Sequence, residues 1–224
     1  MVQGKLLRII RELYHLSPLR KYFFYRYNYM FSPQQLFLFC DSIKKTSELN
    51  GSIVEIGCAE GRSTVFVQKY MQSENIEKRY ICIDTFSGFT KEDVNYEDKL
   101  RNKNKKVLKT QFVANKRKWV DATLKYNGIN NVELYEADIN TFNFDDHKID
   151  KISLCLVDVD LYLPVLSALN KIFDRMEKGG IIIVDDCRQD EYYDGALQAY
   201  NEFIESKNIK SNIVLEKLGL IIKD

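Results

Sequence analysis

Five short runs rich in apolar and β-branched residues recur along the chain, separated by amphipathic or charged segments of helical length. The runs cover residues 52–56, 79–84, 132–136, 152–158 and 180–185. Such alternation is typical of a parallel sheet with helices on both faces, because parallel strands need long crossover connections. Two further runs, 213–217 and 220–223, are close enough around Gly219 to pair as a hairpin. We therefore predict an α/β fold with a mostly parallel seven-stranded sheet and an antiparallel C-terminal hairpin strand.

Composition excludes several classes of protein. The 224 residues, 45% of them hydrophobic, suffice for one globular domain with a full core. A net charge of +1 argues against general nucleic-acid binding. The five cysteines form no C-x-x-C pair, which favours reduced thiols. No apolar run approaches the roughly 18 residues of a membrane span, and the N-terminus lacks the apolar core of a signal peptide. We therefore expect a cytoplasmic protein that is not integral to a membrane.

A glycine-rich segment directly follows the first predicted strand and reads E-I-G-C-A-E-G-R-S-T over residues 55–64. Gly57 and Gly61 allow a sharp turn and a close approach to a ligand, Glu55 offers a carboxylate, and Ser63 or Thr64 can cap the following helix. The E-x-G-x-x-x-G spacing fits methyltransferases. The G-x-G-x-x-G pattern of dinucleotide-binding folds is not met, because position 59 is alanine.

Two acids end the next two strands. Asp84 closes the second strand, where a carboxylate can accept hydrogen bonds from a ribose diol. Asp138 follows the third strand, where it can read an adenine amino group or simply cap its own loop. Both positions lie at the carboxyl edge of the predicted sheet, where ligands of open α/β sheets bind.

Four aspartates follow the last two parallel strands, in V-D-V-D-L-Y at 157–162 and V-D-D at 184–186. Desolvating so many carboxylates is costly unless a cation compensates their charge, so the pattern predicts Mg²⁺ or another hard divalent metal. Asp158, Asp185 and Asp186 are the preferred ligands. The alternative is that one or two of them cap the following helices, and Asp160 is the aspartate that we expect to be structural.

These motifs resemble those of the macrocin O-methyltransferase (TylF-like) family, class I S-adenosylmethionine-dependent enzymes that methylate sugar hydroxyls with the help of a metal. The resemblance extends over about residues 32–219 and rests on four segments in the same order: 54–64, D-T-F-S-G-F at 84–89, 157–162 and G-G-x-x-x-x-D-D at 179–186. Three features depart from the family pattern: Val159 replaces a glycine, Lys178 replaces a proline, and the chain lacks an aromatic ending.

The resemblance implies roles for individual residues. It assigns the metal to Asp158, Asp185 and Asp186, with Asp158 also the catalytic base. It places Glu55, Gly57, Gly61 and Asp84 in the S-adenosylmethionine site. Beside these, we expect Cys58, Ser63 and Asp138 to bind the cofactor because they lie in the same turn or at the same edge of the sheet. The implied fold is the Rossmann-like fold of class I methyltransferases.

The implied function is metal-assisted O-methylation of a sugar hydroxyl in a glycan, a nucleotide-linked sugar or a glycosylated natural product, as in polysaccharide biosynthesis. Two alternatives remain: a catechol or acyl-CoA type of small-molecule O-methyltransferase, and a nucleoside-binding module without catalysis. A nucleic-acid amino-methyltransferase is disfavoured, because the chain has no N-P-P-Y or D-P-P-Y segment. Tyr192 and Tyr193 can stack on a sugar ring or merely cover the sheet edge.

Two segments lie outside the motifs. Residues 1–31 combine a helical apolar pattern with a basic, aromatic stretch, and can serve as a lid, as a contact in a homo-oligomer or as a peripheral contact with an anionic membrane. Residues 32–224 form the predicted methyltransferase domain, with a basic helical insertion near 90–120. Between Arg101 and Lys118 this insertion carries eight basic residues and no acid, which suits either a lid over an anionic sugar or a solvated helix face.

Overall fold

The computed structural model describes residues 2–18, 27–190 and 192–224, and the chain divides into two units, Met1–Met30 and Phe31–Asp224. The first unit contains helix α1 (Val2–Leu16), in which the apolar side chains of Leu6, Ile9 and Leu13 are exposed. The second unit contains the sheet and the motifs. The helices in the described part of the chain are each too short or too polar to span a bilayer.

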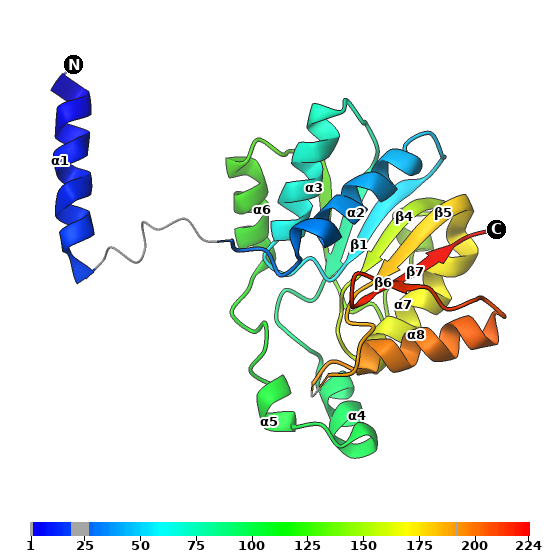
Figure 1. The fold of residues 1–224 in the computed structure, drawn as a ribbon. Coiled ribbons are helices and arrows are strands. Elements are labelled where there is room, and N and C mark those ends of the chain that lie inside the picture. The colour runs from blue at the N-terminus through cyan, green and yellow to red at the C-terminus, as the bar shows by residue number, and fades with distance from the viewer. Residues whose placement is uncertain (1, 19–26, 191) are drawn as a thin grey trace. The chain divides into compact units, whose positions relative to one another are not determined.

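A seven-stranded sheet forms the centre of the second unit (Figure 1), in the order β3-β2-β1-β4-β5-β7-β6. Strands β1 to β5 are parallel, and β7 pairs antiparallel with both β5 and β6. The bounds are β1 Ser52–Ile56, β2 Tyr80–Asp84, β3 Val132–Glu136, β4 Ile152–Val157, β5 Met176–Val184, β6 Ile213–Val214 and β7 Leu218–Ile222. The predicted α/β fold with its antiparallel C-terminal hairpin is confirmed.

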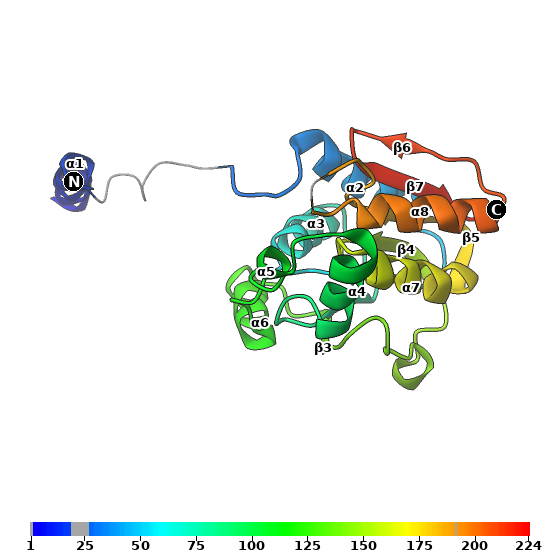
Figure 2. The same ribbon diagram turned by 90° about the horizontal axis from the view of Figure 1, so that it is seen from below.

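Helices cover both faces of the sheet, and α7 and α8 run side by side on one of them (Figures 1 and 2). The helices of this unit are α2 Pro33–Lys45, α3 Arg62–Ser73, α4 Lys91–Arg101, α5 Lys105–Leu108, α6 Arg117–Tyr126, α7 Tyr162–Ile172 and α8 Gly195–Ser206. Helix α2 begins with a capping box between Ser32 and Gln35, and Pro33 follows the cap.

Strand alternation divides the core between the two faces. Ile182 and Val184 of β5 point into the core beneath α7 and α8, whereas Ile183 lies with Phe39 and Ile43 of α2 on the opposite face. The strand order reverses between β1 and β4, so the loops after these two strands diverge at the carboxyl edge. This is the edge at which the glycine-rich segment and the aspartates lie.

Two predicted strands differ from the structure by three residues or more at one end. Strand β5 begins at Met176, four residues before the predicted run, because its first part pairs with the start of β4. The predicted run at 213–217 contains only the two-residue strand β6. Leu215 and Glu216 adopt positive φ angles of 48° and 73°, which form the turn of the hairpin.

Candidate active site

The glycine-rich turn joins β1 to α3 and lies directly against the first aspartate. Gly57 has a φ of 89°, and a Cβ atom added to it would lie 1.8 Å from the carbonyl oxygen of Asp158. The backbone N–H of Asp158 donates to the carbonyl of Ile56 at 2.8 Å, so the two segments are bonded backbone to backbone. Only glycine fits at position 57, and this close approach connects the predicted cofactor turn to the predicted metal site.

Glu55 is fully buried in β1 and accepts hydrogen bonds from three hydroxyl groups and from the thiol of Cys82. Ser63 donates to it at 2.5 Å, Thr64 at 2.6 Å and the hydroxyl of Tyr80 at 2.9 Å. Burial raises the pKa of Glu55, and these donors oppose the rise by stabilising the carboxylate. The expectation that Ser63 or Thr64 caps α3 is wrong: the N-cap is Gly61, and both hydroxyls instead satisfy the buried carboxylate.

The carboxylate of Asp84 holds the glycine-rich turn from the end of β2. Its Oδ2 accepts from the backbone N–H of Ala59 at 2.8 Å, and its Oδ1 accepts from that of Phe86 at 2.6 Å. Burial raises the pKa of Asp84, and the backbone donors lower it. On the other side of the turn, the side-chain amide of Asn115 donates to the carbonyl of Ala59 at 2.6 Å. No motif in the sequence singles out Asn115.

The two remaining predicted cofactor residues have local partners. The thiol of Cys58 is buried, and its hydrogen bond to Cys82, together with burial, raises its pKa. Asp138 accepts from the backbone N–H of Asn140 at 2.8 Å through its side chain. This is the loop-capping bond that the sequence offered as one of two roles. Contact of Asp138 with adenine stays a prediction.

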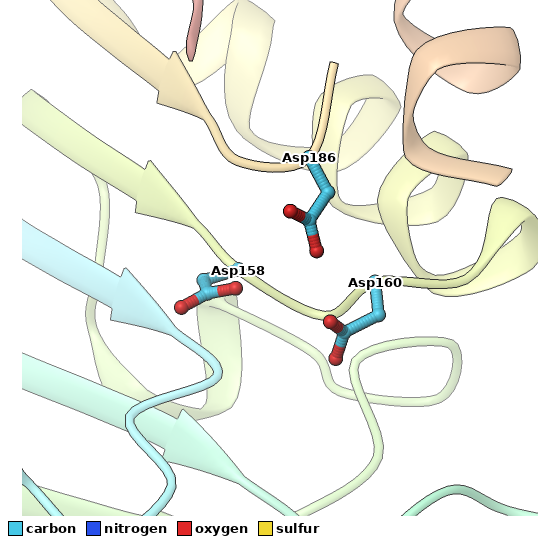
Figure 3. Close-up of side chains that lie close together, drawn as sticks. All are labelled: Asp158, Asp160 and Asp186. Carbon is cyan, nitrogen blue, oxygen red and sulfur yellow. The ribbon is translucent and has the colours of Figure 1, made fainter. Parts of the chain in front are cut away.

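Three aspartates converge at the carboxyl ends of β4 and β5 (Figure 3). One carboxylate oxygen from each of Asp158, Asp160 and Asp186 lies within 4.8 Å of the others. Asp160 and Asp186 have left-handed φ angles of 59° and 54°. Burial and mutual repulsion raise the pKa values of Asp158 and Asp160 well above the ordinary value. We call these three residues the aspartate cluster.

Asp185 is placed differently from its neighbour. Its Oδ2 accepts from the ammonium of Lys217 at 2.7 Å, and the same ammonium lies 3.2 Å from Oδ1 of Asp186. In the described part of the chain, the other oxygen of Asp185 is buried without a hydrogen-bond partner. Burial raises the pKa of Asp185 to about 6, while Lys217 opposes the rise. Metal binding by Asp158, Asp185 and Asp186 stays a prediction. The structure adds Asp160 to the candidate ligands, and it adds Lys217 as a positive charge that pairs with Asp185 and Asp186.

Three aromatic side chains pack together near the end of the glycine-containing segment 84–89, and one of them, Tyr193, lies near the aspartate cluster. The ring of Phe89 lies 5.5 Å from that of Phe112 and 6.3 Å from that of Tyr193, measured between centroids. Burial raises the pKa of Tyr193 to about 12, and the charges of Asp160 and Asp186 add to this shift. Tyr193 is therefore close to the cluster. The sequence alone left two roles open for it, stacking on a sugar ring or covering the edge of the sheet.

Buried ion pairs fix the basic insertion to the rest of the unit. Glu97 of α4 accepts from the backbone N–H of Tyr162 at 2.9 Å and from Arg101 at 2.8 Å. Arg101 and Lys103 both contact Asp194 at 2.7 Å. Lys105 donates to the side chain of Asn95, and Arg117 donates to the carbonyl of Leu134 at 3.3 Å, so at least four of the eight basic residues have partners within the unit. If the insertion is a lid over an anionic sugar, the residues that contact the sugar are therefore the exposed basic residues, such as Lys106 and Lys109.

The family model described as macrocin-O-methyltransferase (TylF) matches residues 34–218. No protein of curated function matches the chain significantly. Among solved structures, the O-methyltransferase NovP superposes with a TM-score of 0.75 at 18% identity, covering 88% of this chain and 83% of its own. The calicheamicin methyltransferase CalS11 has a TM-score of 0.67 at 19% identity, with 85% and 80% covered. The SAH-bound methyltransferase PaMTH1 of Podospora anserina has a TM-score of 0.55 at 16% identity, with 87% and 80% covered. These likenesses show a shared methyltransferase fold.

Proposed function

The chain belongs to the macrocin-O-methyltransferase (TylF) family, and we propose that it methylates a sugar hydroxyl with S-adenosylmethionine and a divalent cation. It is therefore an O-methyltransferase with the class I fold. The observation that carries the finer proposal is the contact between the glycine-rich turn and the aspartate cluster. The backbones of Gly57 and Asp158 lie so close that a Cβ at Gly57 would overlap the carbonyl of Asp158. This contact fixes the distance between the glycine-rich turn, which we assign to the cofactor, and Asp158, which we assign as the proton acceptor.

The turn has the properties that a nucleoside cofactor requires. Gly57, Ala59 and Gly61 have φ angles of 89°, 44° and 78°, which turn the backbone sharply beside the sheet edge. We propose that the backbone of residues 57–61 contacts the cofactor, with Asp84 at its ribose and Asp138 at its adenine. Glu55 and Ser63 stabilise the turn from the interior. When bound, S-adenosylmethionine supplies a methyl group activated by its positively charged sulfur, and the rest of the cofactor leaves as a neutral thioether.

The aspartates fit a hard divalent cation. Their donors are all carboxylate oxygens, the ligands that Mg²⁺ prefers, and their buried charges need compensation beyond the single ammonium of Lys217. Asp158 and Asp186 belong both to the ligand set predicted from sequence and to the aspartate cluster. A cation held by these carboxylates would supply positive charge that favours loss of the proton from the acceptor hydroxyl. We propose that the carboxylate of Asp158 accepts the proton of the acceptor hydroxyl as the bond between the hydroxyl oxygen and the methyl group forms.

The family and the surroundings of the cluster support a sugar as the acceptor. CalS11 is described as a TDP-rhamnose 3'-O-methyltransferase, an enzyme that methylates a nucleotide-linked sugar. In this chain, the rings of Phe89, Phe112 and Tyr193 offer apolar faces on which a sugar ring can stack. Exposed lysines of the insertion, Lys106 and Lys109, can attract the phosphates of a nucleotide-linked sugar.

Methyl transfer to a panel of acceptors tests this proposal. The purified protein is incubated with S-adenosylmethionine and either Mg²⁺ or a chelator, and products are identified by mass spectrometry. The panel contains nucleotide-linked sugars, a catechol and an aromatic acyl-CoA thioester. We expect methylated sugar only with Mg²⁺, loss of product in Asp158→Asn, and full activity in the control Asp150→Asn, which changes an exposed aspartate. Product from only the catechol or the thioester would contradict a sugar acceptor.

Helix α1 supports a proposal about partners. It exposes Leu6, Ile9 and Leu13 and carries Arg8 and Arg11, a combination that suits an anionic membrane surface. Flotation with anionic and with zwitterionic liposomes tests this contact. Recovery with the anionic liposomes alone is expected. Recovery with neither would leave the role of a lid or of a contact between copies of the chain.

The cysteines support a cytoplasmic location, which we also propose. All five are free and buried, as is usual in reducing compartments. Secreted proteins of this size that contain several cysteines commonly pair them in disulfides. Fractionation of cells that express the tagged protein tests the location.

A further inference from the structure

We propose that the segment joining α5 to the first turn of α6 docks on an anionic membrane surface, with Trp119 at the level of the lipid headgroups. We call this segment, residues 109–119, the strap, and Figure 1 shows it as the green trace that runs from α5 into α6. The contact is separate from the one proposed for α1. It does not depend on the proposed methyl transfer.

The strap exposes large apolar side chains. Phe112, Val113 and Trp119 are 44%, 51% and 49% exposed. A single exposed apolar side chain is ordinary, but several in one short segment indicate a surface that another apolar phase covers, because removing apolar area from water is favourable. The strap is therefore a candidate interaction surface.

The same segment is strongly basic. It contains no acid, and its four basic residues are all exposed: Lys109, Lys116, Arg117 and Lys118. The first acid after the strap, Asp121, pairs with Lys125 at 2.7 Å. Glu60, which follows the residue that Asn115 contacts in the glycine-rich turn, pairs with Arg62. The positive charge of the strap therefore remains available to an anionic partner.

An anionic bilayer matches both properties at once. Tryptophan rings are enriched at the headgroup level of membranes, and lysines are attracted to anionic lipids. The ammonium of Lys116 lies 5.4 Å from the ring centroid of Trp119, so charge and ring are presented together. A nucleic acid would also attract the lysines and stack on Trp119, but it offers no apolar phase for the aliphatic side chain of Val113. The acyl region of a bilayer offers that phase.

The strap is attached to the carboxyl edge of the sheet. The side-chain amide of Asn115 donates to the carbonyl of Ala59 in the glycine-rich turn at 2.6 Å. The ring of Phe112 packs edge-on against that of Phe89, with 5.5 Å between their centroids. These contacts hold the strap against the turn and against segment 84–89. A membrane bound by the strap would therefore lie beside the proposed cofactor turn.

Tryptophan fluorescence of the full chain tests this contact directly. Trp119 is the only tryptophan in the sequence, so its emission reports on the strap and not on α1. The protein is mixed with vesicles of phosphatidylcholine alone or of phosphatidylcholine with phosphatidylglycerol. We expect the emission to move to shorter wavelength with the anionic vesicles only, and to be quenched by lipids brominated in their acyl chains. High salt should reverse both effects, because it screens the lysines.

Two double variants separate the strap from the net charge of the protein. Lys109→Glu with Lys118→Glu reverses two charges of the strap, and we expect it to weaken binding to the anionic vesicles by at least about tenfold. The control Lys69→Glu with Lys210→Glu makes the same change of charge at exposed positions outside the strap. It should weaken binding by less than about threefold.

Each other outcome overturns the proposal in a defined way. Flotation of the protein with anionic vesicles while the Trp119 emission stays unchanged would leave the membrane contact to α1 alone. Equal weakening in both double variants would attribute binding to net charge and not to the strap. A spectral shift with single-stranded DNA but not with vesicles would assign the strap to nucleic acid. Thermal melting of each variant identifies a loss of binding that comes from unfolding.

Discussion

Replacement of Lys217 by methionine should destabilise the protein strongly, because it leaves two buried carboxylates without their ammonium. Lys217 contacts Asp185 at 2.7 Å and Asp186 at 3.2 Å, and all three side chains are 12% exposed or less. Removing one partner of such a buried pair costs about 3–5 kcal/mol. In a domain of this size, each kcal/mol lowers the melting temperature by about 2–4 °C, so Lys217→Met should melt about 6–20 °C below the wild type.

Urea denaturation and thermal melting, both with a chelator present, measure this effect. The matched control is Lys125→Met, which breaks a pair with Asp121 of the same 2.7 Å length but with side chains 61% and 49% exposed, and should cost less than about 1 kcal/mol. A double variant that combines Lys217→Met with Asp185→Asn removes one of the two orphaned charges. The double variant should regain at least about 2 kcal/mol relative to Lys217→Met. A loss below about 1 kcal/mol in Lys217→Met, equal to that of the control, would refute the argument that this ion pair is buried and essential.

Two further predictions concern the turn and the cluster. Gly57→Ala should lower the free energy of unfolding by more than the control Gly128→Ala, in which left-handed strain alone costs about 1–2 kcal/mol. A Cβ at position 57 would lie 1.8 Å from a backbone oxygen, whereas one at position 128 would meet nothing nearer than a flexible lysine ammonium at 3.9 Å. Equal free energies of unfolding in urea would contradict this comparison. With a chelator present, the free energy of unfolding should fall as the pH rises from about 4. Burial raises the folded-state pKa of Asp158 well above its ordinary value and that of Asp185 to about 6. The native state therefore retains protons that the unfolded chain has already lost. The fall should be smaller in Asp158→Asn or with Mg²⁺, and an unchanged slope in both would exclude these carboxylates as its source.

The fold was predictable because its signals are local and repeated. Five parallel strands alternate with helical segments, and buried parallel strands are visible in sequence as short apolar runs. The C-terminal hairpin was also visible, as two short runs too close together for a crossover, but its turn was predicted around Gly219, which lies within β7. The bounds were less predictable: Leu215 and Glu216 form the turn with positive φ angles, although neither residue type indicates a turn.

The candidate site was predictable in its elements but not in its contacts. Sequence places Asp158, Asp160, Asp185 and Asp186 at the same edge of the sheet, because each follows a parallel strand. It does not show that Asp185 pairs with Lys217, or that Asp160 and Asp186 adopt left-handed backbone conformations. Such conformations depend on tertiary contacts that the local sequence does not encode.

Contacts between distant segments account for the rest. Lys217 comes from the C-terminal hairpin, outside all four motifs, and meets the aspartates only after β7 pairs with β5. The buried role of Glu55 depends on three hydroxyls, one of them from Tyr80 on the next strand. Asn115 reaches the glycine-rich turn from a loop that follows α5. No single segment of the sequence contains these pairs.

Calorimetric titration with S-adenosylhomocysteine tests the central claim most directly, because it detects the cofactor site without knowledge of the acceptor. We predict binding of one equivalent in the micromolar range. Asp158→Asn should retain this binding, because its carboxylate acts on the acceptor, whereas Gly57→Ala should lose it. Absence of binding to the folded wild type at millimolar ligand would contradict the assignment of the glycine-rich turn to S-adenosylmethionine, and with it the proposed methyl transfer.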